Sequence, residues 1–272
     1  MPLFETEEGV GIHYETAGEG LPLVFIHGWG MSGSVWRFQQ GLAESYRLII
    51  PDLRGHGLSS APDSGYSFEN FGRDLDELFH SLDLDNAVII AWSMGVQTVL
   101  QAFPLFRKRL SALVFVSGTP KFTAAEDYPF GLPSFEARGL GIRLKKDFRK
   151  AVRDFTRRMF TEEECAAGCY KRMVAENMRG ALPAPHAAQA SLISLADADF
   201  RSVVPSVDLP VLLVHGSNDT ICPPTASRYL AGLLPRARLE IMTGAGHAPF
   251  FSRPTEFTNL LGQFIHGIHA DD

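Results

Sequence analysis

Short runs rich in apolar residues recur along this chain, and other patterns separate them. The runs occupy residues 21–26, 46–50, 88–91, 110–116, 209–214 and 238–242. Each has the length and the branched apolar composition of a buried strand. Residues 3–16 predict two further short strands that meet near Gly9.

Between these runs, apolar residues recur at the three- and four-residue spacing of amphipathic helices. This spacing predicts helices over about 35–43, 68–82, 223–233 and 254–268, with Ser67 as the N-cap of the second. Strands that alternate with helices in this way favour a mostly parallel sheet covered by helices on both faces. The predicted fold class is therefore α/β.

The alternation stops between Gly118 and about Ala196. This stretch has no strand pattern, only Pro and Gly punctuation and amphipathic helical segments such as 146–160. We therefore expect an all-helical, four-helix-like cap over residues 121–196. The cap would be inserted between two parts of one α/β core, residues 1–120 and 197–272.

One strand and the helix after it enclose a candidate nucleophile. The sequence Val-Ile-Ile-Ala-Trp-Ser-Met-Gly-Val-Gln at 88–97 places Ser93 on the turn between them. Small residues two positions before and after, Ala91 and Gly95, let strand and helix pack closely. This is the pattern of a nucleophile elbow, with Ala91 in place of the more usual Gly.

A serine hydroxyl becomes a good nucleophile only when an oriented base removes its proton. His247 and Asp219 each follow a predicted strand, so parallel strands would bring them to the same sheet edge as Ser93. Asp219 considered alone could simply form an Asx turn. All three in this order predict a catalytic triad of Ser93, Asp219 and His247.

Chemistry at a carbonyl also needs N–H donors where negative charge develops on oxygen. The backbone N–H of Met94, directly after the nucleophile, is one expected donor. We assign the other to Trp29, in the His-Gly-Trp-Gly loop that follows the strand at 21–26. The Trp29 ring could equally serve as a wall of the substrate pocket, and both roles are compatible.

Composition narrows the class of protein. The 272 residues are 45% hydrophobic and 21% charged, which is ordinary for a soluble globular enzyme. The acidic N-terminus lacks a secretory signal pattern, and no apolar run approaches the ~20 residues of a membrane span. The three cysteines have no disulfide or metal-site spacing and fit a reducing cytoplasm.

The sequence also lacks the motifs that bind common cofactors. No Gly-x-Gly-x-x-Gly or Walker loop is present, so no nucleotide is implied. We expect activity without a cofactor or a metal, no binding to nucleic acid or membrane, and a monomer.

Charge is distributed unevenly along the chain. The whole chain has a net charge of −6, but residues 121–196 contain 13 Lys and Arg against nine Asp and Glu, a net of +4, and the remainder carries −10. The positive charge is densest between Arg138 and Arg158. It could be a solvated helix face or a docking surface for an acidic partner.

These motifs resemble the α/β-hydrolase superfamily over nearly the whole chain. Several look closer still to the family of pimeloyl-[acyl-carrier protein] methyl ester esterases, the carboxylesterases of biotin synthesis. The matching stretches are His27–Gly30, Trp92–Gly95, Ser117–Phe122, Asp147–Lys150, Ala245–Phe250 and Pro254–Phe257. The resemblance implies an α/β-hydrolase fold, a helical cap and hydrolysis of a methyl ester on a carrier-bound dicarboxylate.

The resemblance also implies roles for cap residues. Phe155 matches an aromatic residue of the family's substrate pocket, although it could instead be a buried cap residue. The family's cap contacts the acyl-carrier protein through arginines; here Lys150 and Asp154 stand at two such positions, so that contact set is not reproduced. Neighbouring basic residues could supply the charge: Arg149, Arg153, Lys171, Arg172 and Arg179.

Two other functions remain open from the sequence. The same triad would serve a general carboxylesterase or a C–C bond hydrolase that acts on small free metabolites. A catalytically silent binding protein on this scaffold is the third alternative. Such proteins usually lose a member of the triad, whereas this sequence has all three.

Overall fold

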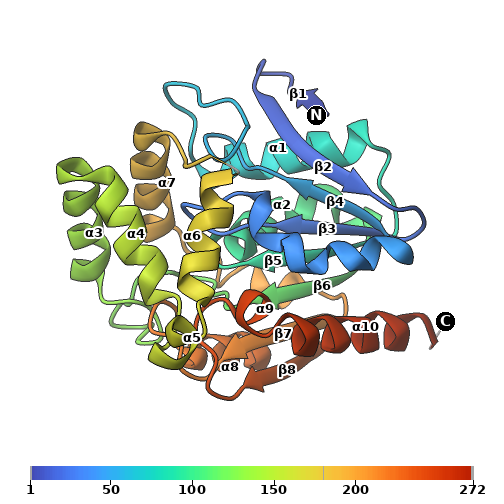
Figure 1. Cartoon of the computed structure of the whole chain (residues 1–272). Coiled ribbons are helices and arrows are strands. Elements are labelled where there is room, and N and C mark those ends of the chain that lie inside the picture. Colours follow the sequence, from blue (N-terminus) through green and yellow to red (C-terminus); the bar gives the residue numbers. More distant parts are fainter. Residues whose placement is uncertain (1, 180, 271–272) are drawn as a thin grey trace.

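The computed structural model describes residues 2–179 and 181–270, and an eight-stranded sheet forms its centre (Figure 1). The strands are β1 (Leu3–Glu5), β2 (Gly11–Ala17), β3 (Pro22–Ile26), β4 (Arg47–Pro51), β5 (Ala87–Trp92), β6 (Leu110–Val116), β7 (Val211–Gly216) and β8 (Ala237–Met242). Their order is β1-β2-β4-β3-β5-β6-β7-β8. Strand β2 pairs antiparallel with both β1 and β4, and all other neighbours are parallel.

The central strands are apolar throughout because both sheet faces are covered. Every residue of β5 and of β7 is buried, and Val24 of β3 pairs with Ile89 of β5 at the middle of the sheet. Continuous apolar strands of this kind are typical of parallel sheets between helical layers. The α/β prediction is confirmed.

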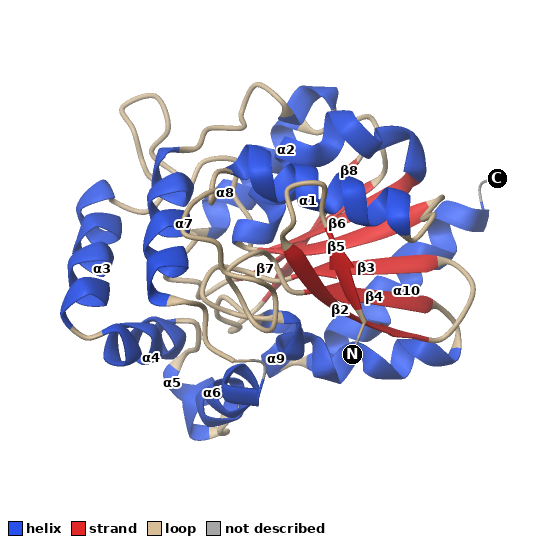
Figure 2. Cartoon of the chain, turned by 90° about the horizontal axis from the view of Figure 1, so that it is seen from above, coloured by secondary structure: helices blue, strands red, loops and turns tan. Residues whose placement is uncertain are grey.

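Helices lie on both faces of the sheet (Figure 2). One face carries α1 (Phe68–Ser81), α2 (Met94–Phe106) and α8 (Pro224–Leu233), and the other carries η1 (Gly33–Glu44), α9 (Pro249–Ser252) and α10 (Pro254–Ala270). Short 3-10 turns, η2 (Arg107–Arg109) and η3 (Val204–Ser206), precede β6 and β7. No helix within the described residues is long and apolar enough to cross a membrane.

Several local details of the structure differ from the predictions. The segment expected as a helix over 35–43 is the 3-10 helix η1, and the four-residue α9 was not expected. Ser67 occupies the N-cap position of α1, but its side chain does not accept a hydrogen bond from the helix. The helix expected over 146–160 begins only at Phe148. Asp147 has an extended backbone and is the N-cap of this helix, because its side chain accepts the N–H of Lys150 at 3.0 Å.

We call residues 121–196 the cap segment. Its helices are α3 (Ser134–Lys146), α4 (Phe148–Arg158), α5 (Glu162–Ala166), α6 (Cys169–Arg179) and α7 (Pro185–Asp197). The expected four-helix-like cap therefore contains a fifth helix, the short α5, among the described residues. The cap segment lies beyond the carboxyl ends of the parallel strands, on one side of the molecule (Figures 1 and 2).

Candidate active site

The turn between β5 and α2 holds Ser93 in a left-handed backbone conformation, with φ 55° and ψ −118°. The turn is tight on both sides. A Cβ on Gly95 would lie 2.8 Å from the carbonyl oxygen of Ile26, so only glycine fits there. At position 91 the methyl group of Ala91 is accommodated and fully buried. Close packing of strand and helix thus orients Ser93 toward the carboxyl edge of the sheet.

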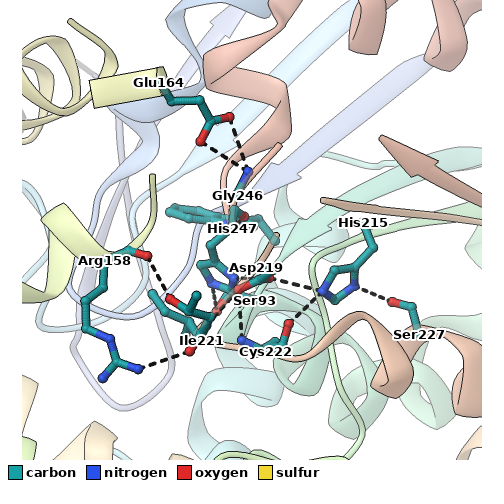
Figure 3. Close-up of polar contacts among 12 residues, drawn as sticks. Ser93, Arg158, Glu164, His215, Asp219, Ile221, Cys222, Ser227, Gly246 and His247 are labelled. Atoms are coloured by element: carbon teal, nitrogen blue, oxygen red, sulfur yellow. Dashed lines mark hydrogen bonds and ion pairs between the residues drawn. The ribbon is translucent and has the colours of Figure 1, made fainter. Parts of the chain in front are cut away.

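The structure brings Ser93, His247 and Asp219 together at that edge (Figure 3). His247 Nε2 lies 2.9 Å from Ser93 Oγ, and His247 Nδ1 lies 2.7 Å from Asp219 Oδ2. Asp219 follows β7 and His247 follows β8, so each is carried by a loop at the end of a parallel strand, as the sequence predicted. Ser93 is 9% exposed, and the His247 ring is fully buried.

Asp219 is held by four hydrogen-bond donors. Its Oδ1 accepts the backbone N–H groups of Ile221 and Cys222 at 2.8 and 3.0 Å, and its Oδ2 faces His247 Nδ1 and also His215 Nε2, at 3.1 Å. Burial alone would raise the pKa of this carboxyl. Attraction to His247 and hydrogen bonds from both histidines outweigh burial and hold the pKa far below its usual range.

An ionised Asp219 fixes the proton on the imidazole of His247. A carboxylate only accepts hydrogen bonds, so His247 Nδ1 carries the hydrogen and Nε2 is left to accept one from the Ser93 hydroxyl. His215 is ordered by the Ser227 hydroxyl, 2.6 Å from its Nδ1. His215 could not be assigned to the site from the sequence, because its position just before a strand-end glycine does not indicate a chemical role.

The loops beside Ser93 offer unused backbone donors. Neither the N–H of Trp29 nor that of Met94 donates to an acceptor within residues 2–179 and 181–270. Gly28 lies against the nucleophile, because a Cβ there would be 3.1 Å from Ser93 Cβ. Both N–H groups therefore remain free of acceptors among the described residues, as the predicted role of oxyanion donors requires.

Comparison with known proteins identifies the architecture. A family model described as the alpha/beta hydrolase fold matches residues 22–254. The chain belongs to the α/β hydrolase family.

Relatives and solved structures agree with this assignment. The hydrolase is 32% identical over 259 residues to a pimeloyl-[acyl-carrier protein] methyl ester esterase from Nitrosomonas europaea, covering 91% of this chain and 97% of that protein. It is 30% identical to a putative non-heme chloroperoxidase from a Synechocystis species, covering 96% and 97%. The solved structure of an esterase from Exiguobacterium antarcticum superposes with a TM-score of 0.90 at 26% identity, covering 97% and 98%.

Phe155 of α4 in this hydrolase packs edge-on against the Trp29 ring, with ring centroids 4.9 Å apart. Beside it lies a cavity of about 350 Å³ whose apolar wall consists of Leu132, Leu140, Ala151, Phe155 and Ile221. Charged residues form the rest of the lining: Glu136, Arg143, Asp154 and Arg158. Ile221 is two residues from Asp219, so the cavity lies next to the loop that carries Asp219.

The candidate carrier-docking residues of the hydrolase fall into two groups. Lys150 forms an ion pair with Asp154, and Arg172 donates to the Ala167 carbonyl and contacts Cys169. In contrast, the side chains of Arg149, Arg153 and Lys171 form no hydrogen bond or ion pair with any described residue. The side chain of Arg179 lies outside the part of the chain that the structure describes.

Two other histidines of the hydrolase, His27 and His56, form hydrogen bonds with the backbone of loops near the site. His27 accepts the N–H of Leu53 at Nε2 and donates from Nδ1 to the Gly28 carbonyl, and His56 donates from Nδ1 to the Arg54 carbonyl. Among the residues that the structure describes, no group of three or more His, Cys, Asp or Glu is placed to hold a metal ion.

Proposed function

We propose that this protein is a serine carboxylesterase with Ser93, His247 and Asp219 as its catalytic triad. The observation that carries the proposal is the hydrogen-bonded series Ser93–His247–Asp219 beside two unused backbone N–H groups. Family membership and the names of the relatives identify the class of enzyme as a carboxylic ester hydrolase.

The geometry suits a two-step reaction through an acyl-enzyme. His247 Nε2 takes the proton of Ser93 Oγ while that oxygen attacks the ester carbonyl. The N–H groups of Trp29 and Met94 stabilise the oxyanion, and Asp219 stabilises the charged imidazole. The alcohol leaves with the proton from His247, and water, deprotonated by His247, then releases the acid and regenerates Ser93.

As the substrate we propose the methyl ester of pimeloyl-[acyl-carrier protein], whose hydrolysis would release methanol and free the pimeloyl carboxylate for biotin synthesis. The support is the name of the Nitrosomonas relative and the charge of the cap segment. Exposed side chains at the corner of α3 and α4 make no ion pair with described residues and could attract an acidic carrier: Arg143, Lys145, Lys146, Arg149 and Arg153. In this proposal, Phe155 and the cavity beside it accommodate the acyl chain.

The second candidate is a general carboxylesterase, or a C–C bond hydrolase, acting on small free metabolites. It is favoured by the superposition on the Exiguobacterium esterase and by the internal pairing of Lys150, which removes one positive charge from any docking surface. A monomer in the cytoplasm that works without cofactor or metal is common to both candidates.

Two measurements test the proposal. A fluorophosphonate probe should label the wild-type protein and not the Ser93→Ala variant; failure to label would exclude a serine hydrolase. The ratio kcat/KM should then be compared for the carrier-bound methyl ester and a short p-nitrophenyl ester, at low and moderate salt. Preference for the carrier-bound ester that weakens with salt supports carrier docking, whereas a salt-independent preference for the small ester favours the second candidate.

A further inference from the structure

A carboxylate from the cap segment reaches the loop that carries His247. Glu164 of α5 is 8% exposed, and its Oε1 and Oε2 lie 3.2 and 3.1 Å from the backbone nitrogen of Gly246, the residue before His247 (Figure 3). Glu164 Oε2 also accepts the N–H of Thr161 at 2.9 Å. Two N–H groups from segments far apart in the sequence therefore converge on one buried side chain.

The cap segment holds the next residue of the loop as well. The N–H of His247 donates to the carbonyl of Met159 at 2.7 Å. A Cβ on Gly246 would lie 2.4 Å from that same carbonyl oxygen, so the loop and the cap segment pack without space between them. From the core side, the indole N–H of Trp92 donates to the carbonyl of His247 at 2.8 Å.

The same part of the cap segment contacts the loop that carries Asp219. Arg158 Nη2 donates to the carbonyl of Thr220 at 3.0 Å, and the Thr220 hydroxyl donates to the carbonyl of Arg158 at 3.3 Å (Figure 3). Thr220 directly follows Asp219. Residues 158–164 therefore bind both loops that carry the residues acting on Ser93.

We infer that Glu164 is a positioning residue, which sets the catalytic orientation of His247 by holding Gly246; the inference rests on the triad of the proposed function. The chemistry favours this role because a carboxylate is the side chain that only accepts hydrogen bonds, and charge-assisted bonds to backbone N–H are stronger than neutral ones. Displacing a catalytic group by about 1 Å can cost about 100-fold in rate.

The alternative is that Glu164 only stabilises α5. It does form a capping box with Thr161, whose hydroxyl accepts the N–H of Glu164 at 3.2 Å. The chain offers a matched control for this alternative, because Thr161→Ala removes that part of the capping box and leaves the carboxylate on Gly246.

The experiment compares Glu164→Ala, Glu164→Gln and Thr161→Ala in the full-length protein, with a p-nitrophenyl ester as the substrate. We expect Glu164→Ala to lower kcat about 10- to 100-fold with less than about a threefold change in KM. Glu164→Gln, which keeps one acceptor oxygen, should fall between Glu164→Ala and wild type. Thr161→Ala should retain kcat within about twofold although its Tm falls.

A second measurement does not depend on activity. Amide hydrogen exchange at Gly246 and His247, followed by NMR, should accelerate at least about tenfold in Glu164→Ala and not in Thr161→Ala. If wild-type protein hydrolyses no ester, the proposed function fails, and exchange still decides whether Glu164 holds the loop. The inference is overturned by unchanged exchange, by a kcat within twofold of wild type in Glu164→Ala, or by an equal loss in Thr161→Ala.

Discussion

The carboxyl edge of the sheet and the outer surface of the cap segment differ in how their charged side chains are placed. Those at the sheet edge are buried and paired, whereas several on the cap segment are exposed and have no partner among the described residues. At the sheet edge, the carboxylate of Asp219 is buried and meets four donors. At the corner of α3 and α4, side chains such as Arg149 and Arg153 are exposed and have no partner among the described residues. The three residues at the sheet edge find their hydrogen-bond partners within the folded chain, whereas the exposed charges of the cap segment are available to a second molecule.

The first prediction concerns the loss of the proposed nucleophile, Ser93. Ser93→Ala should lower kcat for ester hydrolysis by about 10⁴- to 10⁶-fold, because His247 then has no hydroxyl to activate. Steady-state turnover, with circular dichroism to verify the fold, provides the measurement. Turnover near that of wild type would remove Ser93 from the mechanism.

The second prediction concerns a substitution that keeps the shape of the Asp219 side chain but removes its charge. Asp219→Asn should lower kcat by about 10³- to 10⁴-fold, because an amide no longer fixes the hydrogen on His247 Nδ1. The variant should still fold, since an amide oxygen can accept the N–H groups of Ile221 and Cys222. A loss in kcat of less than tenfold would contradict the assigned role.

The third prediction concerns pH and a buried histidine near the site. Burial, with a smaller contribution from His27, lowers the pKa of His56 to about 3. Below pH 6.5 the unfolded chain binds a proton at this histidine and the folded chain does not, so stability falls as the pH falls from about 6.5 toward 3. At pH 5.5 this group should cost about 1.4 kcal/mol.

Urea unfolding at pH 7.5 and pH 5.5 measures that effect. His56→Asn should be less stable than wild type at pH 7.5 because it loses ring packing, but its stability should decrease less between the two pH values, by about 1.4 kcal/mol. An identical pH dependence in wild type and variant would show that His56 is not the group responsible.

The fourth prediction tests the cap surface and carries the smallest effect. Arg149→Ala and Arg153→Ala should each lower kcat/KM for the carrier-bound ester about two- to fivefold, because a rim charge acts mainly on the rate of encounter. Lys150→Ala, which removes a charge already paired with Asp154, should change it by less than twofold. All three should leave hydrolysis of a small ester unchanged; an equal loss on both substrates would argue against docking.

The sequence predicted the sheet and the three residues at its edge because both follow from regular chain geometry. Continuous apolar strands indicated a parallel sheet, and such a sheet places every strand-end loop at one edge, so Ser93, Asp219 and His247 could be brought together without coordinates. The turn at Ser93 was also recognisable from the sequence, through the glycine at position 95. A Cβ at that position would lie 2.8 Å from the carbonyl oxygen of Ile26, so the turn requires glycine there.

The contacts between the cap segment and the site could not be predicted in the same way. Thr161 and Glu164 have the spacing of a capping box, which a sequence can reveal, but the reach of Glu164 to Gly246 depends on how α5 packs on the core. The 3-10 geometry of η1 also depends on tertiary packing more than on apolar spacing. The break at Asp147 follows from a local N-cap hydrogen bond, which apolar spacing does not report. The ion pair between Lys150 and Asp154 could have been predicted from the sequence, because the two residues have the i,i+4 spacing of neighbours on a helix.

The left-handed backbone of Ser93 implies a conflict between durability and activity at this position. A residue with a Cβ at φ 55° is held in an unfavourable conformation at a cost of about 1–3 kcal/mol, whereas glycine adopts it freely. Ser93→Gly should therefore unfold at a higher temperature than Ser93→Ala, although both variants lack the hydroxyl that the proposed mechanism needs. If stability alone were selected, glycine would be expected at position 93. The serine therefore indicates that this position is retained for function at a cost in stability.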